Sequence, residues 1–595
     1  MNTRQIIFLQ LPRLDPDITS PGENLMPAAA CLRAALERSP EAKHWEVIDT
    51  TAGQNTDADA ALVDQIAGLQ PDALSATCYL WNIERTLHLL KLLKKRLPAL
   101  KIVIGGPDIA ANHPLLLCPP SSVLRPRKAL PADAWVIGEG ETVFPAVLRF
   151  FRTGQAPAFH GVAWRTADGT FAEGTRKRPV KPLQDLLPAP DHPINRPDAF
   201  GMAYLETNRG CPMRCAFCCY NLRRSTTTCL PPEEVATRIR ILRARGAKEI
   251  RLVDPTFNAH PRFDEILEVM TRENSDRAIA FFVEIRADTL TDEQARRLAL
   301  AGVAEAEVGI QSTDPKVLKI IHRPLNADRV LRGIEALLRH GIKPTLDFMY
   351  ALPAQDENDI GRSLDWLARF GDAIHPQFLP TLLLPGTELR DRAQELGIRA
   401  QRLPPYRVQS TDTLSARQLA KIEAWANERL GGFDSPTQRF VGVRLPDLFP
   451  SRMRSPVGTP PRGVRNAAMS STDGRRGEAS LPMASSNRQA LLFSGTDLFA
   501  QRESLATLIR RHVLSEPHIL WQFVLEPTQE EPLDLFDFLI AAFGKLPGHW
   551  LDRLVSPPGQ RRLCARRLFV KLPRGNAFDP AWTEEVEALL STRFH

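Results

Sequence analysis

The sequence predicts an α/β protein. We expect a flavodoxin-like, doubly wound (Rossmann-like) N-terminal domain, a partial (β/α)6 barrel of TIM type and a small, mostly helical C-terminal segment. Two observations predict the first two parts: short apolar runs alternate with stretches of helical periodicity over residues 1–150, and the alternation resumes over residues 201–397. Such alternation favours parallel strands covered by helices. A third observation predicts the last part, because residues 491–595 show helical periodicity and a single strand candidate, Leu568–Leu572.

Five apolar runs are the strand candidates of the N-terminal domain: Gln5–Leu11, Trp45–Asp49, Ala73–Tyr79, Lys101–Gly105 and Ala134–Gly138. Amphipathic stretches between these runs are expected to be helices. In doubly wound domains, ligands bind beyond the carboxyl ends of the strands. We therefore expect a ligand of this domain to be held by residues 10–12, 78–82, 105–108 and 138–141.

Residues 151–200 are expected to form a connector. Asp168-Gly169 is a hairpin turn signal, and a Pro-rich stretch follows from Pro179 to Pro197. The barrel strands come next, and their candidates are Ala203–Asn208, Glu249–Val253, Ile279–Arg286, Ala306–Gln311, Thr345–Tyr350 and Gln377–Leu384. Active sites of such barrels lie at the C-terminal ends of the strands.

Beyond the barrel the pattern weakens. We expect a helical extension over residues 398–449, a disordered linker over 450–490 and a domain of unknown role over 491–595. The net charge of +7 owes much to the linker, where seven Arg stand against two acidic residues. We interpret this stretch as solvated and do not expect nucleic acid as a partner. The alternative is a nucleic-acid-binding arm, whose binding would depend strongly on salt.

The composition excludes several classes of protein. Hydrophobic residues make up 43% and charged residues 24% of the 595 residues, which excludes a chain that is disordered throughout. No apolar run approaches the roughly 18 residues that span a bilayer. The N-terminus lacks the apolar core and cleavage site of a secretory signal. We therefore expect a cytoplasmic protein without a membrane span.

Four of the nine cysteines fall within nine residues: Cys211, Cys215, Cys218 and Cys219. The spacing C-x3-C-x2-C begins just after the first barrel strand. Three thiolates on one loop can hold three irons of a [4Fe–4S] cluster and leave the fourth iron open to a cofactor or substrate. A structural zinc site usually needs four protein ligands. A non-catalytic zinc-binding scaffold is therefore the alternative from a different class.

This spacing, with Phe217 before the third cysteine, resembles the radical S-adenosylmethionine (SAM) superfamily. The resemblance implies a [4Fe–4S] cluster on Cys211, Cys215 and Cys218. It also implies reductive cleavage of SAM to a 5′-deoxyadenosyl radical, with electrons from an external donor such as flavodoxin or ferredoxin. Cys219 and Cys229 fall outside the triad, and either a packing or a substrate-side role is open for them.

The same resemblance assigns SAM contacts at later strand ends. Asp254 stands where the family binds the methionyl amine, although the usual Gly-Gly-Glu letters are absent. Glu284 and Arg286, two residues apart on one face of a strand, suit the ribose hydroxyls and the methionyl carboxylate; a structural ion pair is the alternative. Gln311 is assigned to the ribose and Phe217 to the cofactor's surroundings.

Three segments of the N-terminal domain resemble the cobalamin-binding class of that superfamily, in an uncharacterised branch with a C-terminal domain of unknown function. They are Cys78–Glu84, Ile104–Asp108 and Gly138–Glu141. The resemblance assigns cobalamin (B12) contacts to Tyr79, Trp81, Gly105, Gly106, Gly138 and Gly140. No Asp-x-His-x-x-Gly motif is present, so the lower cobalt face is expected to have no His ligand. The alternative is a purely structural domain. We expect His113, His160 and His192 to be surface loop residues.

Together these features predict a cobalamin-dependent radical SAM enzyme that modifies, most commonly by methylation, an unactivated carbon of a small-molecule or peptide substrate. One alternative is a radical SAM enzyme without cobalamin that performs a rearrangement, a ring formation or a methylthiolation. The other is the zinc scaffold. The substrate, the oligomeric state and the role of residues 491–595 stay open.

Overall fold

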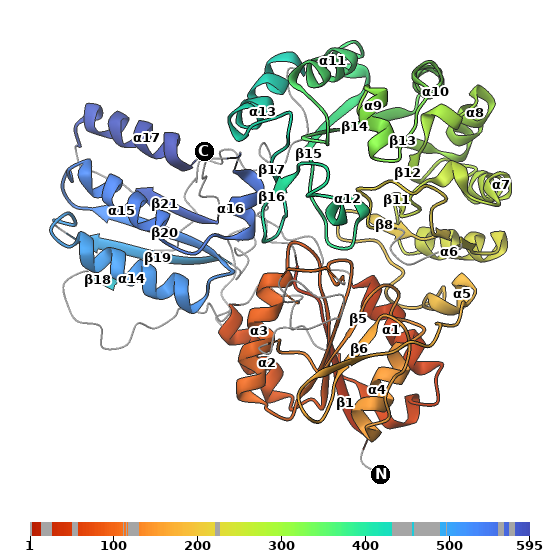
Figure 1. The fold of residues 1–595 in the computed structure, drawn as a ribbon, viewed down its shortest axis with the longest axis horizontal. Helices are drawn as coiled ribbons and strands as arrows, with labels where there is room; N and C mark the ends of the chain where they lie inside the picture. Colours follow the sequence, from red (N-terminus) through yellow and green to blue (C-terminus); the bar gives the residue numbers. More distant parts are fainter. Residues whose placement is uncertain are drawn as a thin grey trace, which may run out of the picture.

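The structure is a computed structural model with three α/β parts (Figure 1). It describes residues 3–12, 26–49, 58–110, 112–114, 116, 130–220, 227–430, 455–456, 488–495, 497–556, 558, 565–570 and 578–594. The predicted linker over 450–490 therefore lies almost wholly outside the described residues, as does the end of the predicted extension.

The N-terminal domain is a parallel sheet with helices on both faces. Its strands are β1 (Arg4–Leu9), β2 (Trp45–Val47), β3 (Ala73–Thr77), β4 (Lys101–Gly105) and β5 (Ala134–Val136). Their order is β2-β1-β3-β4-β5, which confirms the flavodoxin-like prediction. The covering helices are α1 (Pro27–Glu37), α2 (Asp59–Gly68), α3 (Ile83–Arg96) and α4 (Phe144–Thr153).

Alternation along the strands gives this sheet two cores. Ile7 and Leu9 pack with α2 and α3 on one face. Ile6 and Phe8 pack with α1 and α4 on the other face. Because successive strand side chains point to opposite faces, a continuous apolar run such as Ile6–Leu9 is what a sheet covered on both sides needs.

The predicted connector contributes two strands to the same sheet. β6 (Val162–Arg165) and β7 (Phe171–Glu173) add to β5 in antiparallel orientation. The Asp168-Gly169 turn joins them, and the Phe171 ring stacks on Trp135 at 4.7 Å between centroids. The hairpin was correctly predicted, but it belongs to the N-terminal domain because it covers an otherwise open sheet edge.

The barrel is a six-stranded parallel sheet in the order β8-β11-β12-β13-β14-β15. The strands are β8 (Met202–Leu205), β11 (Glu249–Leu252), β12 (Ala280–Ile285), β13 (Val303–Gln311), β14 (Lys343–Tyr350) and β15 (His375–Pro380). The larger helices are α6 (Pro232–Ala244), α7 (Phe263–Glu273), α8 (Asp292–Ala301), α10 (Ala327–Arg339) and α11 (Glu357–Ala368). They follow the outside of the curved sheet (Figure 1), so the partial (β/α)6 barrel is confirmed.

Several short elements follow the barrel strands or extend the barrel. They are α5 (Leu183–Leu186), β9 (Asn208–Arg209), β10 (Thr228–Cys229), α9 (Pro315–Ile320), α12 (Glu388–Asp391), β16 (Arg399–Ala400), β17 (Val408–Ser410) and α13 (Ala416–Leu430). The helix α13 accounts for the helical part of the predicted extension. The β16–β17 hairpin, which the sequence did not indicate, leads the chain towards the other domains.

The C-terminal part contains a four-stranded parallel sheet rather than one strand among helices. Its strands are β18 (Ser455–Pro456), β19 (Arg488–Gly495), β20 (Leu520–Pro527) and β21 (Arg566–Val570), in that order. The helices α14 (Arg502–Ser515), α15 (Asp534–Gly544), α16 (Trp550–Val555) and α17 (Pro580–Phe594) accompany them. The run at β20 has buried apolar residues on both faces, interrupted by Gln522 and Glu526, and such a run is hard to tell from a buried helix by periodicity.

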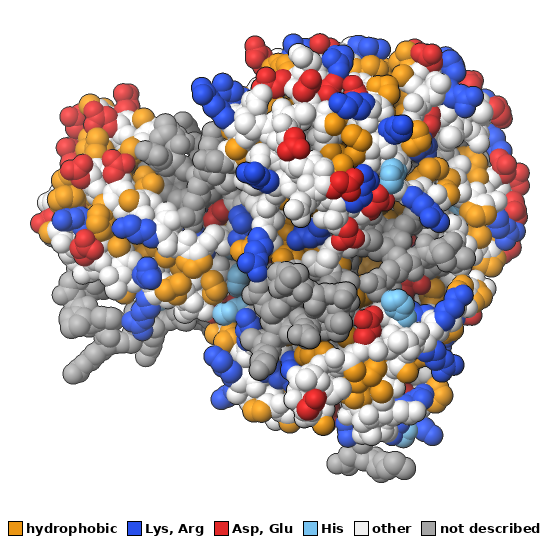
Figure 2. Space-filling model, in the orientation of Figure 1, with side chains coloured by type: hydrophobic (Ala, Val, Ile, Leu, Met, Phe, Trp, Pro, Cys, Tyr) orange, Lys and Arg blue, Asp and Glu red, His pale blue; other side chains and the backbone are white. Residues whose placement is uncertain are grey.

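The C-terminal part lies beside both other parts (Figure 1). The Arg553 guanidinium donates to the Pro404 carbonyl oxygen next to the barrel and forms an ion pair with Glu84 of the N-terminal domain. The Glu516 carboxylate accepts from the Asp59 and Ala60 amides at the start of α2. In Figure 2, basic and acidic side chains are interspersed over the visible face of the barrel. None of the helices in the described ranges is long and apolar enough to cross a membrane.

Candidate functional site

The cysteine segment begins directly after β9, at the C-terminal end of the first barrel strand. β9 pairs with β10 in antiparallel orientation, which fixes the start of the segment. Desolvation, with smaller contributions from the neighbouring thiols of Cys219, Cys215 and Cys211, raises the pKa of Cys218 to about 12. The predicted triad is therefore close enough in space for its members to repel one another when ionised. Cations would favour their thiolate forms.

Two side chains from other strand ends touch the triad. The Cys211 Sγ lies 3.4 Å from the Thr256 hydroxyl oxygen. An Arg323 guanidinium N–H donates to the Cys215 Sγ at 3.4 Å, and the same guanidinium donates to the Gly309 carbonyl oxygen. Arg323 was not singled out in the sequence. Its guanidinium thus lies between the cysteine segment and the end of β13.

Asp254 anchors the turn that leads into the cysteine segment. Its side chain is fully buried. One carboxylate oxygen accepts from the Thr207 amide at 2.9 Å and the Asn208 amide at 3.1 Å, and the other accepts from the Thr207 hydroxyl. Burial raises its pKa to about 7. The geometry therefore gives Asp254 a supporting role, and its predicted contact with the methionyl amine has no support in this conformation.

Arg286 does not pair with Glu284. The strand β12 ends at Ile285, so Arg286 leaves the pleat and forms an ion pair with Asp288 at 2.6 Å. Its guanidinium also donates to the Pro324 carbonyl oxygen at 2.9 Å and lies 3.7 Å from the Met213 sulfur within the cysteine segment. Arg286 thus reaches the predicted cofactor site, but from the loop and not from the strand.

Glu284 faces other carboxylates. Its register neighbour on β13 is Glu307. Burial raises the pKa of Glu284 to about 7, with further contributions from Glu307 and Asp254. Burial and Glu307 also raise the pKa of Asp347 on β14. The inner side of the barrel sheet is therefore acidic at these strands. The Arg323 guanidinium lowers the pKa of Asp347 in part.

Gln311 and Phe217 lie at the same end of the barrel as the triad. Gln311 ends β13 and is 8% exposed. A Cβ on Gly309 would lie 2.6 Å from the Gln311 amide nitrogen and 2.8 Å from the Arg323 guanidinium, so glycine there makes room for both. Phe217 packs against the apolar cluster around Ile321 and Leu352. The sequence-predicted SAM residues are therefore brought together.

The glycines of the N-terminal domain shape the strand-end loops. Gly106 has φ +112°, and a Cβ there would lie 2.5 Å from the Cys78 carbonyl oxygen. A Cβ at Gly140 would lie 2.8 Å from Leu32. Gly138 has φ +80°. At Gly106 and Gly140 the loops approach the neighbouring backbone and α1 more closely than a residue with a side chain could. Such closely packed loops can present backbone to a large ligand.

Trp81 lies against the C-terminal part. Its ring stacks on Tyr79 at 4.3 Å between centroids, with an angle of 9° between the planes. It packs against the cluster formed by Leu520, Trp550, Leu551 and Leu554. The ring thus helps to dock the C-terminal part, and its predicted cobalamin contact stays a prediction. Tyr79 stays a candidate contact.

A buried polar trio joins the N-terminal domain to the region after the barrel. The His113 Nε2 lies 3.1 Å from the Asp108 carboxylate and 2.6 Å from the Tyr406 hydroxyl. The Tyr406 hydroxyl donates to Asp108 at 3.0 Å. His113 is fully buried, so its expected surface position was wrong. The sequence holds no signal for this trio because Tyr406 lies almost 300 residues from its partners.

Other polar contacts bring the strand-end loops of the two domains together. The Asn112 side chain accepts from the Gly386 amide at 2.6 Å and donates to Asp391 at 2.6 Å. Arg209, two residues before Cys211, donates to Glu141 at 2.8 Å. Burial raises the pKa of Cys219, and the Asp108 carboxylate of the N-terminal domain adds to the increase, so this thiol lies on the side of that domain. The predicted cofactor loops therefore face each other.

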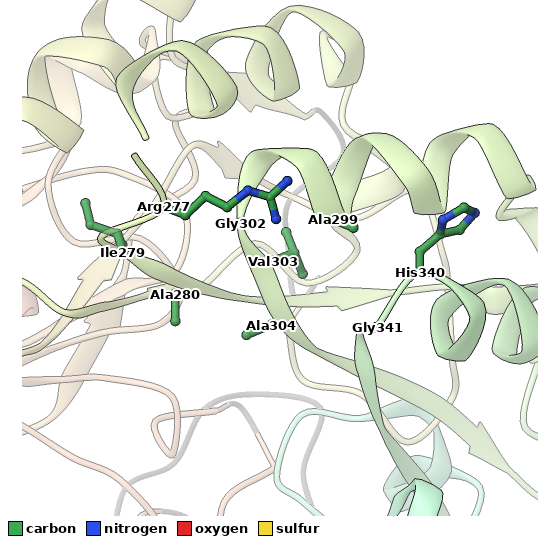
Figure 3. Close-up of a pocket in the computed structure, with 9 residues that line it drawn as sticks. All are labelled: Arg277, Ile279, Ala280, Ala299, Gly302, Val303, Ala304, His340 and Gly341. Carbon is green, nitrogen blue, oxygen red and sulfur yellow. The ribbon is translucent and has the colours of Figure 1, made fainter. Parts of the chain in front are cut away.

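A pocket of about 250 Å³ opens at the other end of the barrel (Figure 3). Its lining comes from the beginnings of β12, β13 and β14, and includes Arg277, Val303 and His340. Barrel active sites lie at the opposite strand ends, where the cysteines are. We therefore do not assign the chemistry to this pocket. Within the described ranges, no three His, Cys, Asp or Glu side chains could hold a single metal ion.

Comparison with known proteins identifies both domains. The radical SAM superfamily model matches residues 205–367, and the B12-binding domain model matches residues 28–148. The chain therefore contains a radical SAM domain and a B12-binding domain, the combination that defines the cobalamin-dependent class of the radical SAM superfamily. These two matches coincide with the barrel and with the doubly wound domain described above. A [4Fe–4S] cluster, SAM and cobalamin are the cofactors that these domains imply.

Two solved structures show the same fold at low sequence identity. One is the radical SAM methyltransferase TsrM from Kitasatospora setae with cobalamin and a [4Fe–4S] cluster bound. It aligns with a TM-score of 0.53 and 16% identity over 67% of this chain and 77% of that chain. TsrM with tryptophan substrate and a SAM analogue bound aligns with a TM-score of 0.52 and 16% identity over 68% of this chain and 80% of that chain.

Two curated relatives are methyltransferases. The 2-(S-pantetheinyl)-carbapenam-3-carboxylate methyltransferase of Streptantibioticus cattleyicolor is 25% identical over 50% of this chain and 44% of that protein. The cobalamin-dependent radical SAM methyltransferase TokK of Streptomyces tokunonensis is 22% identical over 56% of this chain and 50% of that protein. The chain thus spans about half the length of these relatives.

The residues of this radical SAM protein fit the implied cofactors. Three thiols on one short segment are the donor set of a [4Fe–4S] cluster with one open iron. The glycine-lined loops of the B12-binding domain offer backbone without side chains. Glu284, Arg286 and Gln311 supply the carboxylate, guanidinium and amide that a zwitterionic nucleoside can bind.

Proposed function

We propose that the protein is a cobalamin-dependent radical SAM methyltransferase that methylates an unactivated carbon of a small-molecule or peptide substrate. One observation carries the proposal. The Cys211–Cys218 segment at the barrel's strand ends faces the Gly138–Glu141 loop of the B12-binding domain: Arg209, two residues before Cys211, binds Glu206 of the barrel and Glu141 of that loop. The methyltransferase relatives and the TsrM fold support the same assignment.

Each group of residues has a separate task in this proposal. Cys211, Cys215 and Cys218 hold the cluster, and Arg323 positions Cys215 by donating to its sulfur. Arg286 binds the carboxylate of SAM from the loop after β12, where Asp288 and the Pro324 carbonyl fix its guanidinium.

Gln311 and Glu284 lie on the neighbouring strands and are proposed to bind the ribose. When bound, the cofactors supply reductive cleavage of SAM and a transferable methyl group. The protein's own contribution is to hold the reacting groups in line and to exclude water between the two domains. The electron comes from an external donor such as flavodoxin or ferredoxin.

The test is anaerobic reconstitution of the full chain with iron, sulfide and hydroxocobalamin, followed by gel filtration and metal analysis. We expect about four irons and one cobalamin per chain, and deoxyadenosine after addition of SAM and dithionite. Four irons without cobalamin would replace the proposal by a radical SAM enzyme that does not use cobalamin. Zinc without iron would reject both.

A matched pair of variants sharpens this test. Cys215→Ala should abolish cluster formation because it removes one of three ligands. Cys229→Ala is the control: Cys229 belongs to β10 and lies outside the triad, so it should keep the iron content of the parent protein. Equal iron loss in both variants would contradict the assigned ligand set.

A further inference from the structure

Arg209 is the centre of an ion-pair cluster between the two cofactor domains. Its guanidinium binds the Glu206 carboxylate in a bidentate manner, with N–O distances of 2.7 and 2.9 Å. A second edge donates to Glu141 at 2.8 Å and approaches Glu139 at 3.5 Å. Glu206 and Arg209 belong to the barrel, whereas Glu139 and Glu141 belong to the B12-binding domain.

The cluster is shielded from solvent. The side chain of Arg209 is 15% exposed, that of Glu141 10% and that of Glu206 17%. The carboxylates of Glu206 and Glu141 raise the pKa of Arg209 despite its burial, so its charge is held firmly. Charge-assisted contacts between an arginine and carboxylates at such a site have fixed geometry, unlike exposed ion pairs, which contribute little.

The backbone on each side ends in a cofactor loop. Arg209 precedes Gly210, which has φ +105°, and Cys211 follows. The residues before Arg209 are fixed because Asp254 binds the Thr207 and Asn208 amides. Arg209 therefore connects the cysteine segment, through Gly210, to a turn that these hydrogen bonds hold in place.

On the facing side, Glu139 and Glu141 lie in the loop that starts at Gly138 with φ +80°. Arg178 donates to the Glu139 and Ile137 carbonyl oxygens and supports this loop from behind. The Glu141 side chain is thus presented to Arg209 by the loop proposed to contact cobalamin. A change that orders the cysteine segment therefore also restricts the Gly138–Glu141 loop, because the Arg209 guanidinium connects them.

We propose that Arg209 couples the two cofactor sites, so that cluster assembly tightens cobalamin binding and cobalamin binding stabilises the cluster. This inference rests on the proposed function. Arg209 acts as a positioning residue because its contacts are to protein carboxylates. Ordering of the cysteine segment by the cluster fixes Arg209 and with it the Glu141 loop, so less ordering is left for cobalamin to impose. Thermodynamic linkage makes the effect reciprocal.

The experiment measures the dissociation constant of hydroxocobalamin by anaerobic spectral titration of the full chain. One sample holds the reconstituted cluster, and the other has been stripped of iron with a chelator. We expect about tenfold tighter binding with the cluster in the parent protein, within the usual range of coupling between sites. In Arg209→Gln the two constants should become equal, while Arg209→Lys should keep part of the difference.

Two further variants separate coupling from folding. Glu141→Gln removes the partner on the cobalamin side and should abolish the difference even if Arg209→Gln does not fold. Arg245→Gln is the control, because Arg245 also donates several hydrogen bonds, to the carbonyl oxygens of Asp191, His192 and Asn195, far from either cofactor loop. It should keep the tenfold difference.

The outcomes distinguish this inference from the proposed function. A parent protein that binds no cobalamin in either form overturns the proposed function. Cobalamin binding that is equally tight with and without the cluster overturns the coupling and leaves the function standing. A difference that persists in both Arg209→Gln and Glu141→Gln shows that other contacts carry it, and also overturns the role of Arg209.

Discussion

Removing the charge of Asp254 should make the barrel less sensitive to pH without disturbing its turn. Asp254→Asn keeps a carbonyl oxygen for the Thr207 and Asn208 amides, and its amide group can donate to the Thr207 hydroxyl. Asp254→Ala leaves both amides buried without an acceptor. At about 1–3 kcal/mol for each unsatisfied buried group, the Ala variant should lose about 4 kcal/mol of local stability.

The pH dependence has a definite sign. Burial raises the pKa of Asp254 from 3.8 to about 7, so between these values the folded protein holds a proton that the unfolded chain has lost. Stability therefore falls as pH rises through this window and levels off above it. Between pH 5 and pH 7 the loss amounts to about 3 kcal/mol, at about 1.4 kcal/mol for each pKa unit.

Hydrogen–deuterium exchange at pH 5 and pH 8, read from peptides that cover β8 and β11, is the assay. We expect the parent protein to open more readily at pH 8 and Asp254→Asn to show a smaller difference between the two pH values, because the raised pKa of Glu284, about 7, still contributes. Asp276→Asn is the control, because Asp276 is an exposed acid paired with Arg243. A parent-like pH difference in Asp254→Asn would refute the reasoning, as would parent-like protection in Asp254→Ala.

Three further substitutions test the strand-end loops and domain contacts. Gly106→Ala should lower the free energy of unfolding by about 3 kcal/mol, because the residue has a positive φ and its Cβ would clash with the Cys78 backbone. We expect a lower thermal midpoint and weaker cobalamin binding. An unchanged midpoint would contradict the clash. Trp81→Ala should weaken docking of the C-terminal part by about 2 kcal/mol, seen as faster proteolysis within residues 497–556, and equal rates would argue against this docking role. Tyr406→Phe should cost about 2 kcal/mol by leaving Asp108 and His113 without their hydroxyl partner, measured by thermal unfolding against the exposed control Tyr204→Phe.

Local sequence patterns were sufficient for the two main sheets. All five N-terminal strands and all six barrel strands overlap their predicted ranges, although several begin one to three residues earlier, because these runs are apolar and are bounded by turn residues. The cysteine spacing likewise located the candidate cluster without knowledge of tertiary structure. The C-terminal sheet was missed because β20 is buried on both faces and carries no alternation.

The contacts between domains could not be predicted from such patterns. Arg209 and Glu141 are 68 residues apart, and Tyr406 and His113 are 293 residues apart. Trp81 shows the same difficulty. An aromatic residue in a ligand-binding loop suggests a ligand contact, yet the apolar partners of its ring lie in a domain more than 400 residues later. Spacing rules describe one element, whereas these partners are chosen by how whole domains pack.

The position of the C-terminal part has a consequence for the order in which the protein matures. The Arg407 guanidinium is 1% exposed and donates to the Leu554 carbonyl oxygen, and Trp81 is covered by residues of the same late region. During synthesis, the first two domains emerge with this cation and this ring still uncovered. The native contacts between the three parts can therefore form only after almost the whole chain has been synthesised, and such long-range contacts favour slow folding. A chain shortened after the barrel would keep both groups permanently uncovered, and its defects would report on lost packing as much as on any lost chemistry.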